Sequence, residues 1–270
     1  MELLGLAPQI LRARAFRLYA QGGRRIVDLW QNGGAAALGH KSGSLLHELK
    51  NYCERGLSAP APHFMEARCF KALQRIFPGR HFRIYASPPR ALEDLAAQGL
   101  AALWRPFENE GAHLFVAKNA PPILVPVSPG IQAWRAPENP AGDAGALPIG
   151  FCALAIAAEA SIRALPPGDF LPPALLAVAA RGLHDIIAAT DRARRFPRVE
   201  KALRAPGCAW RHRGIYLTHQ CAGENWEALF RAFLDAGFLL PPDPCQPAIL
   251  PGELSAGEEA RLAELLGGDT

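Results

Sequence analysis

The sequence contains no closely spaced pair of cysteines, no cluster of basic residues interleaved with aromatic residues, and no long apolar run. Its six cysteines include no C-x-x-C pair. The apolar start over residues 1–10 is too short for a signal peptide, so we expect reduced thiols and a cytoplasmic location. The net charge is +4, but the arginines are scattered rather than interleaved with aromatic residues, which argues against a nucleic-acid partner. No apolar run is long enough to span a bilayer, so no membrane partner is expected.

Two common catalytic or metal-binding patterns are absent or incomplete. No G-x-S-x-G elbow is present, so a serine hydrolase is not expected. Cys208, His212, His219 and Cys221 form the pattern C-x3-H-x6-H-x-C. Zinc accepts such ligands, but this is not one of its standard spacings. We therefore favour buried cysteines beside exposed histidines over a metal site.

The chain is rich in turn-forming residues, with 25 glycines and 25 prolines in 270 residues. This composition predicts short elements joined by many turns. A chain of this length holds one large or two small domains. Helical patterns flank short strand patterns without an internal repeat, which predicts an α/β or α+β protein.

The stretch from residue 24 to 40, RRIVDLWQNGGAAALGH, is the most informative local pattern. It predicts a strand over 26–30, a turn at Gly33-Gly34 and a run of small residues that closes on Gly39-His40. A glycine pair lets the backbone approach a bulky group closely. Such a segment either lines a ligand or packs tightly against another backbone, and the spacing alone favours plain packing.

Periodicity and capping residues predict the elements around this stretch. In the N-terminal part they are a short helix or arm over 7–19, a hairpin turn over 21–23, helices over 44–55 and 63–77, and a strand over 81–86. In the middle they are a strand over 113–117, an extended surface connection over 121–140, a buried helix over 148–165 and a helix over 173–194. At the C-terminal end they are a strand over 213–218, an amphipathic helix over 225–236, a strand over 238–240, and a last helix that begins at the capping box Ser255…Glu258.

A turn with the sequence Ser87-Pro88-Pro89-Arg90 separates the strand over 81–86 from a helix predicted over 91–104. Free backbone N–H groups at such a turn suit an anion or a phosphate. Two prolines remove two of these donors. On the residues alone, a helix cap without a ligand is the favoured interpretation.

Two runs of the sequence carry a resemblance to a known family. GRRIVDLWQNGGAAALGH, followed by a helix and RGL, resembles the opening of class III, fold-type I aminotransferases, which use pyridoxal phosphate, and the glutamate-1-semialdehyde aminomutase branch is similar there. The run from NWEALFRAFLDAGFLLPPDPCQPAILP to SAGEEARLAELL is similar to that family's closing segment. The resemblance implies a reduced fold-type I aminotransferase-like α/β fold. A small lobe would be built from residues 1–85 and 196–270, and residues 86–195 would be a truncated central remnant of the cofactor domain.

The resemblance also implies a set of site residues. Only five lysines exist in the chain, and Lys118, just after a predicted strand, is the one candidate for the Schiff base. By position, Ser87 and Arg90 would bind the cofactor phosphate. The substrate side would be lined by Trp30, Gln31 and Asn32. The family supplies an aspartate for the pyridine nitrogen from a strand ending Asp-Glu, and no such strand is found.

These losses leave two functional hypotheses. The lysine forms the Schiff base and moves the proton, while the carboxylate keeps the pyridine nitrogen protonated. The first hypothesis is an aminotransferase-like protein, weak or lacking in transamination, that still handles pyridoxal phosphate and a small amino or keto acid. The second is a non-catalytic pseudoenzyme that acts as a dimerising partner or scaffold. Because the family's sites form between subunits, the resemblance implies a homodimer or pairing with a related chain.

Overall fold

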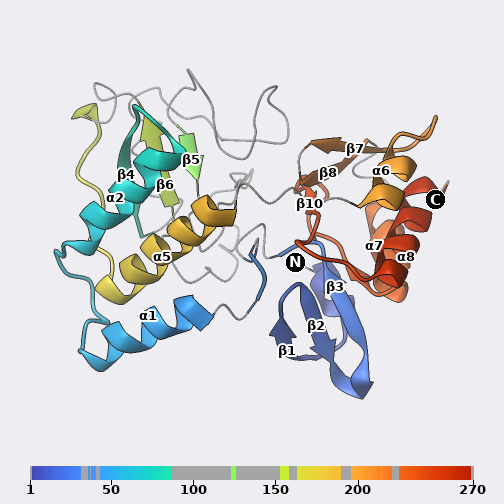
Figure 1. The fold of residues 1–270 in the computed structure, drawn as a ribbon, viewed down its shortest axis with the longest axis horizontal. Coiled ribbons are helices and arrows are strands. Elements are labelled where there is room, and N and C mark those ends of the chain that lie inside the picture. Colours follow the sequence, from blue (N-terminus) through green and yellow to red (C-terminus); the bar gives the residue numbers. More distant parts are fainter. Residues whose placement is uncertain are drawn as a thin grey trace. The chain divides into compact units, whose positions relative to one another are not determined.

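The chain forms two compact units (Figure 1). The computed structural model describes residues 2–31, 36, 38–40, 43–86, 123–125, 153–157, 163–189, 196–213, 215–220 and 225–268. Unit 1 consists of Met1–Lys41 and Arg192–Thr270, and unit 2 of Ser42–Asp191. Both ends of the chain therefore build one unit. The segment 1–85, which was expected to belong to the small lobe as a whole, is divided between the two units. The segment boundaries at residues 85 and 195 stay predictions.

The first sheet of unit 1 has the strand order β1-β2-β3-β9. β1 (Ile10–Arg14), β2 (Arg17–Ala20) and β3 (Arg25–Asp28) are antiparallel neighbours. β9 (Phe238–Leu239) lies parallel to β3, with Val27 opposite Phe238. This parallel pair joins the two ends of the chain in one sheet.

The prediction of a helix or arm over residues 7–19 is wrong. A short 3-10 helix, η1 (Glu2–Leu6), comes first, and β1 and β2 follow as a hairpin. Arg12 stands opposite Tyr19 and its guanidinium lies 4.3 Å from the centre of the tyrosine ring, a cross-strand contact. The hairpin turn predicted over Gln21–Gly23 is confirmed as η2, which joins β2 to β3.

The second sheet of unit 1 has the order β10-β8-β7, with all pairs antiparallel. Its strands are β7 (Trp210–Arg213), β8 (Tyr216–His219) and β10 (Ala248–Ile249). The single strand predicted over 213–218 is therefore wrong in extent, because the chain turns back within it. Arg213 pairs with Tyr216 across the hairpin.

The helices of unit 1 are α6 (Pro197–Leu203), α7 (Trp226–Asp235) and α8 (Ala256–Gly267). The predicted amphipathic helix is confirmed as α7, and Gly237 follows it with φ +90°. The predicted capping box is confirmed at the start of α8. There the Ser255 hydroxyl accepts the N–H of Glu258, and the Glu258 carboxylate accepts the N–H of Ser255.

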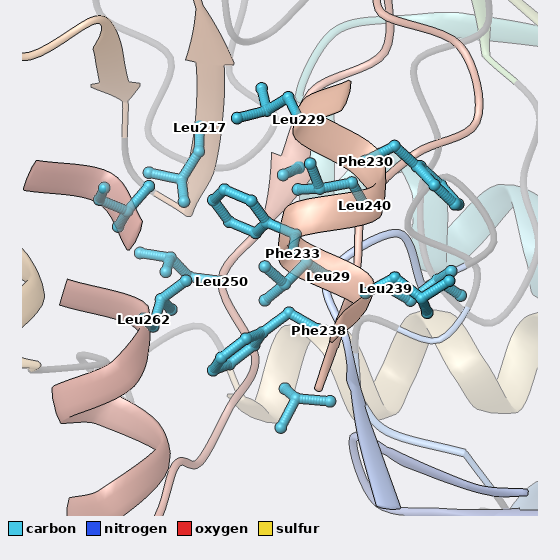
Figure 2. Packing of buried hydrophobic residues seen from close by; sticks show 14 of the residues in the cluster. Leu29, Leu217, Leu229, Phe230, Phe233, Phe238, Leu239, Leu240, Leu250 and Leu262 are labelled. Carbon is cyan, nitrogen blue, oxygen red and sulfur yellow. The ribbon is translucent and has the colours of Figure 1, made fainter. Parts of the chain in front are cut away.

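A hydrophobic core joins these elements (Figure 2). Leu29, Phe230 and Leu262 are completely buried, although Leu29 directly follows β3 and the other two come from α7 and α8. Figure 2 shows Leu29 near Phe233, with Leu250 and Leu262 on one side of them and Phe230 pointing to the other side. Because most of its members come from the two ends of the sequence, this core stabilises unit 1 only when both ends are in place.

A cluster of charged side chains links the N-terminal sheet to α8. Arg17 binds the Glu258 carboxylate at two points, with Nε–Oε1 and Nη2–Oε2 distances of 3.0 and 2.8 Å, and it reaches Glu253 at 2.7 Å. Arg25 lies 3.3 Å from the same carboxylate. The Glu258 side chain is only 2% exposed. Burial alone would raise its pKa, but Arg17 and the Ser255 cap prevail and lower the pKa to about 2.

Unit 2 contains helices packed beside a small antiparallel sheet. α1 (Gly43–Glu54) and α2 (Met65–Ile76) both pack against α5 (Pro173–Ala189) (Figure 1). The sheet has the order β4-β6-β5. Its strands are β4 (His81–Tyr85), β5 (Ile123–Val125) and β6 (Ala153–Ala157). On β4, Phe82 and Ile84 are buried, and Phe82 stacks on Phe70 of α2 with ring centres 5.9 Å apart.

The helices predicted over 44–55, 63–77 and 173–194 are confirmed as α1, α2 and α5, and the strand predicted over 81–86 as β4. The helix predicted over 91–104 lies outside the described residues. Two predictions are wrong. The apolar run over 148–165 contains strand β6 rather than a helix, and the expected surface connection over 121–140 contains strand β5. An unbroken apolar run suits a strand or a helix equally, so periodicity alone could not decide. The strand predicted over 113–117 lies outside the described residues.

Within the described residues, no helix is both long and apolar enough to cross a membrane. Four of the cysteines in that part of the chain are free thiols, and Cys69 is completely buried between α2 and α5. Its thiol donates a hydrogen bond to the Leu176 carbonyl at 3.0 Å, and burial raises its pKa. Cys69 is therefore a packing residue rather than a reactive thiol.

Candidate functional site

Asp28, the last residue of β3, organises the segment that follows the strand. Its carboxylate is 3% exposed. Oδ1 accepts the backbone N–H groups of Trp30 and Gln31 at 2.9 and 2.7 Å, and Oδ2 lies 2.8 Å from Nε2 of His40. Hydrogen bonds from an aspartate to the backbone just ahead turn the chain sharply. The strand consequently ends at Asp28, not at residue 30 as the sequence predicted.

The two described residues of the predicted substrate side, Trp30 and Gln31, are anchored to the C-terminal segment. Trp30 Nε1 donates to Gln246 Oε1 at 3.0 Å, and Gln31 Nε2 donates to the Ile249 carbonyl at 3.0 Å. Gln31 is completely buried and has φ +52°, in the left-handed region. Among the described residues, nothing pairs with Gln31 Oε1. A buried acceptor without a partner costs about 1–3 kcal/mol, so an N–H or O–H group placed there would be bound favourably.

His40 closes the same segment from its other end. Its backbone forms a bridge with Ala15, and its side chain is 22% exposed. Gly39 has φ +92°, and a Cβ atom there would come within 3.1 Å of the Ala15 backbone. Glycine is therefore required for His40 to reach Asp28. A buried carboxylate that orients a partly exposed imidazole is an arrangement that holds or transfers a proton.

The Asp28–His40 pair was missed by sequence reasoning. The available signals were a charged residue at the end of an apolar strand and a histidine that closes a run of small residues. No helical or strand period connects positions 12 residues apart, so only the folded turn reveals the contact. The structure thus brings Trp30, Gln31, Asp28 and His40 into one cluster within unit 1.

The other predicted site residues lie outside the described part of the chain. These residues are Asn32, Ser87, Arg90 and Lys118, and the Gly33-Gly34 turn belongs with them. Their roles stay predictions.

The described residue next to the predicted phosphate turn is Ala86, at the end of β4. Its N–H donates to Oδ2 of Asp169 at 2.8 Å. The N–H of Asp169 donates to the Ile84 carbonyl, also at 2.8 Å. A carboxylate is therefore bound to the first backbone donor after the strand.

The described residues do not fit pyridoxal phosphate. The cofactor requires an amine for its carbonyl carbon and a carboxylate for its pyridine nitrogen. Of the lysines in the described ranges, Lys50, Lys71 and Lys201 are all exposed on helices, and Lys50 lies 3.6 Å from Glu54. β4, β5 and β6 contain neither lysine nor an acidic residue. The described strands of this sheet therefore supply neither group.

The described residues of the cysteine and histidine pattern near the β7–β8 hairpin make other contacts. Cys208 donates to the carbonyls of Trp210 and Leu266, and His219 lies edge-on to Trp210 with ring centres 5.0 Å apart. His212 is exposed, and Cys221 lies outside the described residues. Within the described ranges, no group of three or more His, Cys, Asp or Glu residues is arranged to hold a metal ion.

Comparison with solved structures identifies the fold. The chain superposes on ornithine aminotransferase from Plasmodium yoelii with a TM-score of 0.64 and 9% identity, covering 96% of this chain and 92% of that one. An omega-transaminase from Sphaerobacter thermophilus gives a TM-score of 0.59 and 12% identity, covering 96% and 90% of the two chains. A transaminase with PLP bound gives 0.62 and 14%, covering 96% and 89%. The protein therefore has a fold-type I aminotransferase-like α/β fold, as the sequence predicted.

Sequence comparison places the chain in a family. No protein-family model matches it. An uncharacterized protein of Treponema pallidum (strain Nichols) is 32% identical over 282 residues, which cover 93% of this chain and 91% of that one. The chain belongs to the same family as this Treponema protein.

Proposed function

We propose that this chain is an aminotransferase-like protein of the class III, pyridoxal-phosphate type that transaminates weakly or not at all. The aminotransferase fold supports the first part. The observation that carries the second part is the composition of the unit 2 sheet, whose described strands contain no lysine and no carboxylate. A non-catalytic pseudoenzyme that serves as a dimerising partner or scaffold is the limiting case.

A residual activity would depend on residues that the sequence predicts. Lys118 would supply the amine, Ser87 and Arg90 would hold the phosphate, and a small amino or keto acid would be the substrate. The unpartnered Oε1 of Gln31 favours residual activity over the pseudoenzyme, because this oxygen is an acceptor suited to a substrate amino group. Pyridoxal phosphate would supply an electron sink for the substrate carbon.

Borohydride trapping tests the proposal. Full-length protein is incubated with pyridoxal phosphate, reduced with borohydride and mapped by mass spectrometry. We expect no adduct specific to Lys118, and no amino transfer between amino and keto acids above the rate of Lys118→Ala. Lys50→Ala is the matched control, since Lys50 is an exposed helix lysine whose side chain is 70% exposed. An adduct confined to Lys118, together with turnover that Lys118→Ala abolishes and Lys50→Ala preserves, would establish an active enzyme instead.

We also propose that the chain forms a homodimer or pairs with a related chain, on the basis of the family resemblance. Light scattering at micromolar concentration should give about twice the mass of the 29.1 kDa chain. A monomer mass that persists at ten times that concentration would contradict the homodimer.

We further propose a cytoplasmic location. The free thiols of Cys53, Cys69, Cys208 and Cys245 support this location, because a reducing compartment keeps thiols unpaired.

A further inference from the structure

β1 is the edge strand of the N-terminal sheet (Figure 1). One of its edges pairs with β2, and no strand in the described ranges pairs with the other. The register shifts just before Arg12, which marks a bulge, and Ala15 beyond the strand forms a bridge with His40. The regular open edge is therefore Arg12–Arg14. Unpaired backbone N–H and C=O groups on such an edge are a template for one more strand.

The arginines of β1 differ from others in this sheet. Arg17 and Arg25 bind the buried carboxylate of Glu258. Arg12 and Arg14 are exposed, and neither forms an ion pair within the described part of the chain. The open edge of β1 thus carries two positive charges that no described carboxylate neutralises.

These two charges have a defined spacing. Residues two apart on a strand point to the same face, so Arg12 and Arg14 lie side by side, with their backbone positions about 7 Å apart. The guanidinium of Arg12 is held over the ring of Tyr19, 4.3 Å from its centre. Ala13, between the two arginines, packs against the core of unit 1. The spacing matches carboxylates at every second residue of a neighbouring strand.

A second copy of this chain is a poor occupant of the edge. Antiparallel pairing of two β1 strands would place the arginines of one copy opposite or diagonal to those of the other, on the same face. Like charges at these cross-strand distances destabilise the pairing. A strand with carboxylates at these positions gains charge-assisted hydrogen bonds instead.

We propose that the open edge of β1 docks an extended acidic segment of a partner protein as an added strand, with carboxylates at every second residue paired with Arg12 and Arg14. Main-chain hydrogen bonds supply the pairing, and the carboxylate spacing supplies the specificity. A nucleic acid or an anionic membrane would match the charge but would leave the backbone groups of the edge without a strand to pair with. The docking is independent of the proposed function, because neither arginine is among the predicted cofactor or substrate residues.

Fluorescence anisotropy of dye-labelled peptides with the full chain tests the docking. The probe peptide alternates glutamate and valine. One control alternates lysine and valine, and another has the composition of the probe but carries its glutamates and valines in two separate blocks. We expect the probe to bind at least about tenfold more tightly than either control, and to weaken as salt is added. Equal affinity for the block peptide, or no binding of the probe at millimolar concentration, overturns the inference.

Arg14→Glu reverses one charge of the edge. Its affinity for the probe should fall at least about fivefold, while its affinity for the lysine peptide should rise. Arg14→Lys keeps the charge and should retain most of the binding. Arg261→Glu is the matched control, since Arg261 is exposed on α8 and has no ion pair in the described ranges, and it should leave both affinities unchanged.

Two further results would contradict the docking of an acidic strand. One is an equal loss of probe affinity in Arg14→Glu and Arg261→Glu, which would mean that the net charge of the chain is responsible. The other is tighter binding of single-stranded DNA or of phosphatidylserine vesicles than of the probe, lost in Arg14→Glu, which would assign the edge to a different partner. Circular dichroism checks the fold of each variant, and Arg12→Glu decides the outcome if Arg14→Glu does not fold.

Discussion

Replacing Glu258 by glutamine should lower the free energy of unfolding by about 3 kcal/mol. The buried carboxylate binds Arg17 at two points and also contacts Arg25. Its pKa falls from 4.5 to about 2 on folding, which corresponds to a stabilisation on the order of 3 kcal/mol at neutral pH. Removing one partner also leaves Arg17, whose side chain is 14% exposed, without its main counter-charge. Urea unfolding followed by tryptophan fluorescence and circular dichroism measures the change.

Glu253→Gln is the matched control. Glu253 also contacts Arg17, at 2.7 Å, but its side chain is 61% exposed. An ion pair on the surface contributes about 0–1 kcal/mol, so this variant should remain close to the wild type. Equal losses in the two variants would show that burial of Glu258 has no special role.

The same carboxylate predicts how stability depends on pH. Because the folded pKa of Glu258, about 2, is below the unfolded value of 4.5, its contribution is complete above about pH 4.5 and is lost as the pH falls toward 2. The difference in urea midpoint between the wild type and Glu258→Gln should therefore be large near pH 6 and should shrink toward pH 2. A difference that is constant across this range would exclude the ionised carboxylate as its source.

Leu29→Ala should destabilise the chain by about 3–5 kcal/mol. Leu29 is completely buried in the core that Figure 2 shows, where it lies among residues of α7, β9 and the C-terminal segment. Its backbone also joins these parts, since its N–H donates to Leu239 and its carbonyl accepts from Ile249. Truncation removes buried apolar surface and leaves a cavity that neighbours fill only partly. The measurement is the shift in urea midpoint at constant slope.

Leu11→Ala is the control for the chemical change alone. Leu11 lies on the edge strand β1 with 66% of its surface exposed. The same truncation there should change stability by less than about 0.5 kcal/mol. If Leu11→Ala costs as much as Leu29→Ala, burial in this core does not explain the effect.

Elements with strong local signals were predictable from the sequence. α7 follows from apolar residues at helical spacing and from Gly237, and α8 follows from the pair Ser255 and Glu258. In both helices the stabilising contacts lie within a few residues, so the local sequence is sufficient. The resemblance of the two ends to aminotransferases likewise led to the observed fold class.

Elements that depend on distant partners were not predictable. β1 and β2 form because Arg12, Tyr19 and their neighbours pair across a hairpin and against β3. β6 forms because the strand lies between β4 and β5, while its composition also suits a helix. Of the candidate site, Trp30 and Gln31 were identified from the resemblance, whereas their contacts with Gln246 and Ile249 appear only in the folded unit.

The sequence by itself determined the fold class, the capped helices and the scarcity of lysine, because each depends on residue identity or on short-range spacing. Only the tertiary structure decided that Asp28 would bind His40 and that Asp169 would bind the end of β4. The second of these contacts joins residues 83 positions apart. A carboxylate selects its partners by distance and burial, and both are set only when the whole unit has folded.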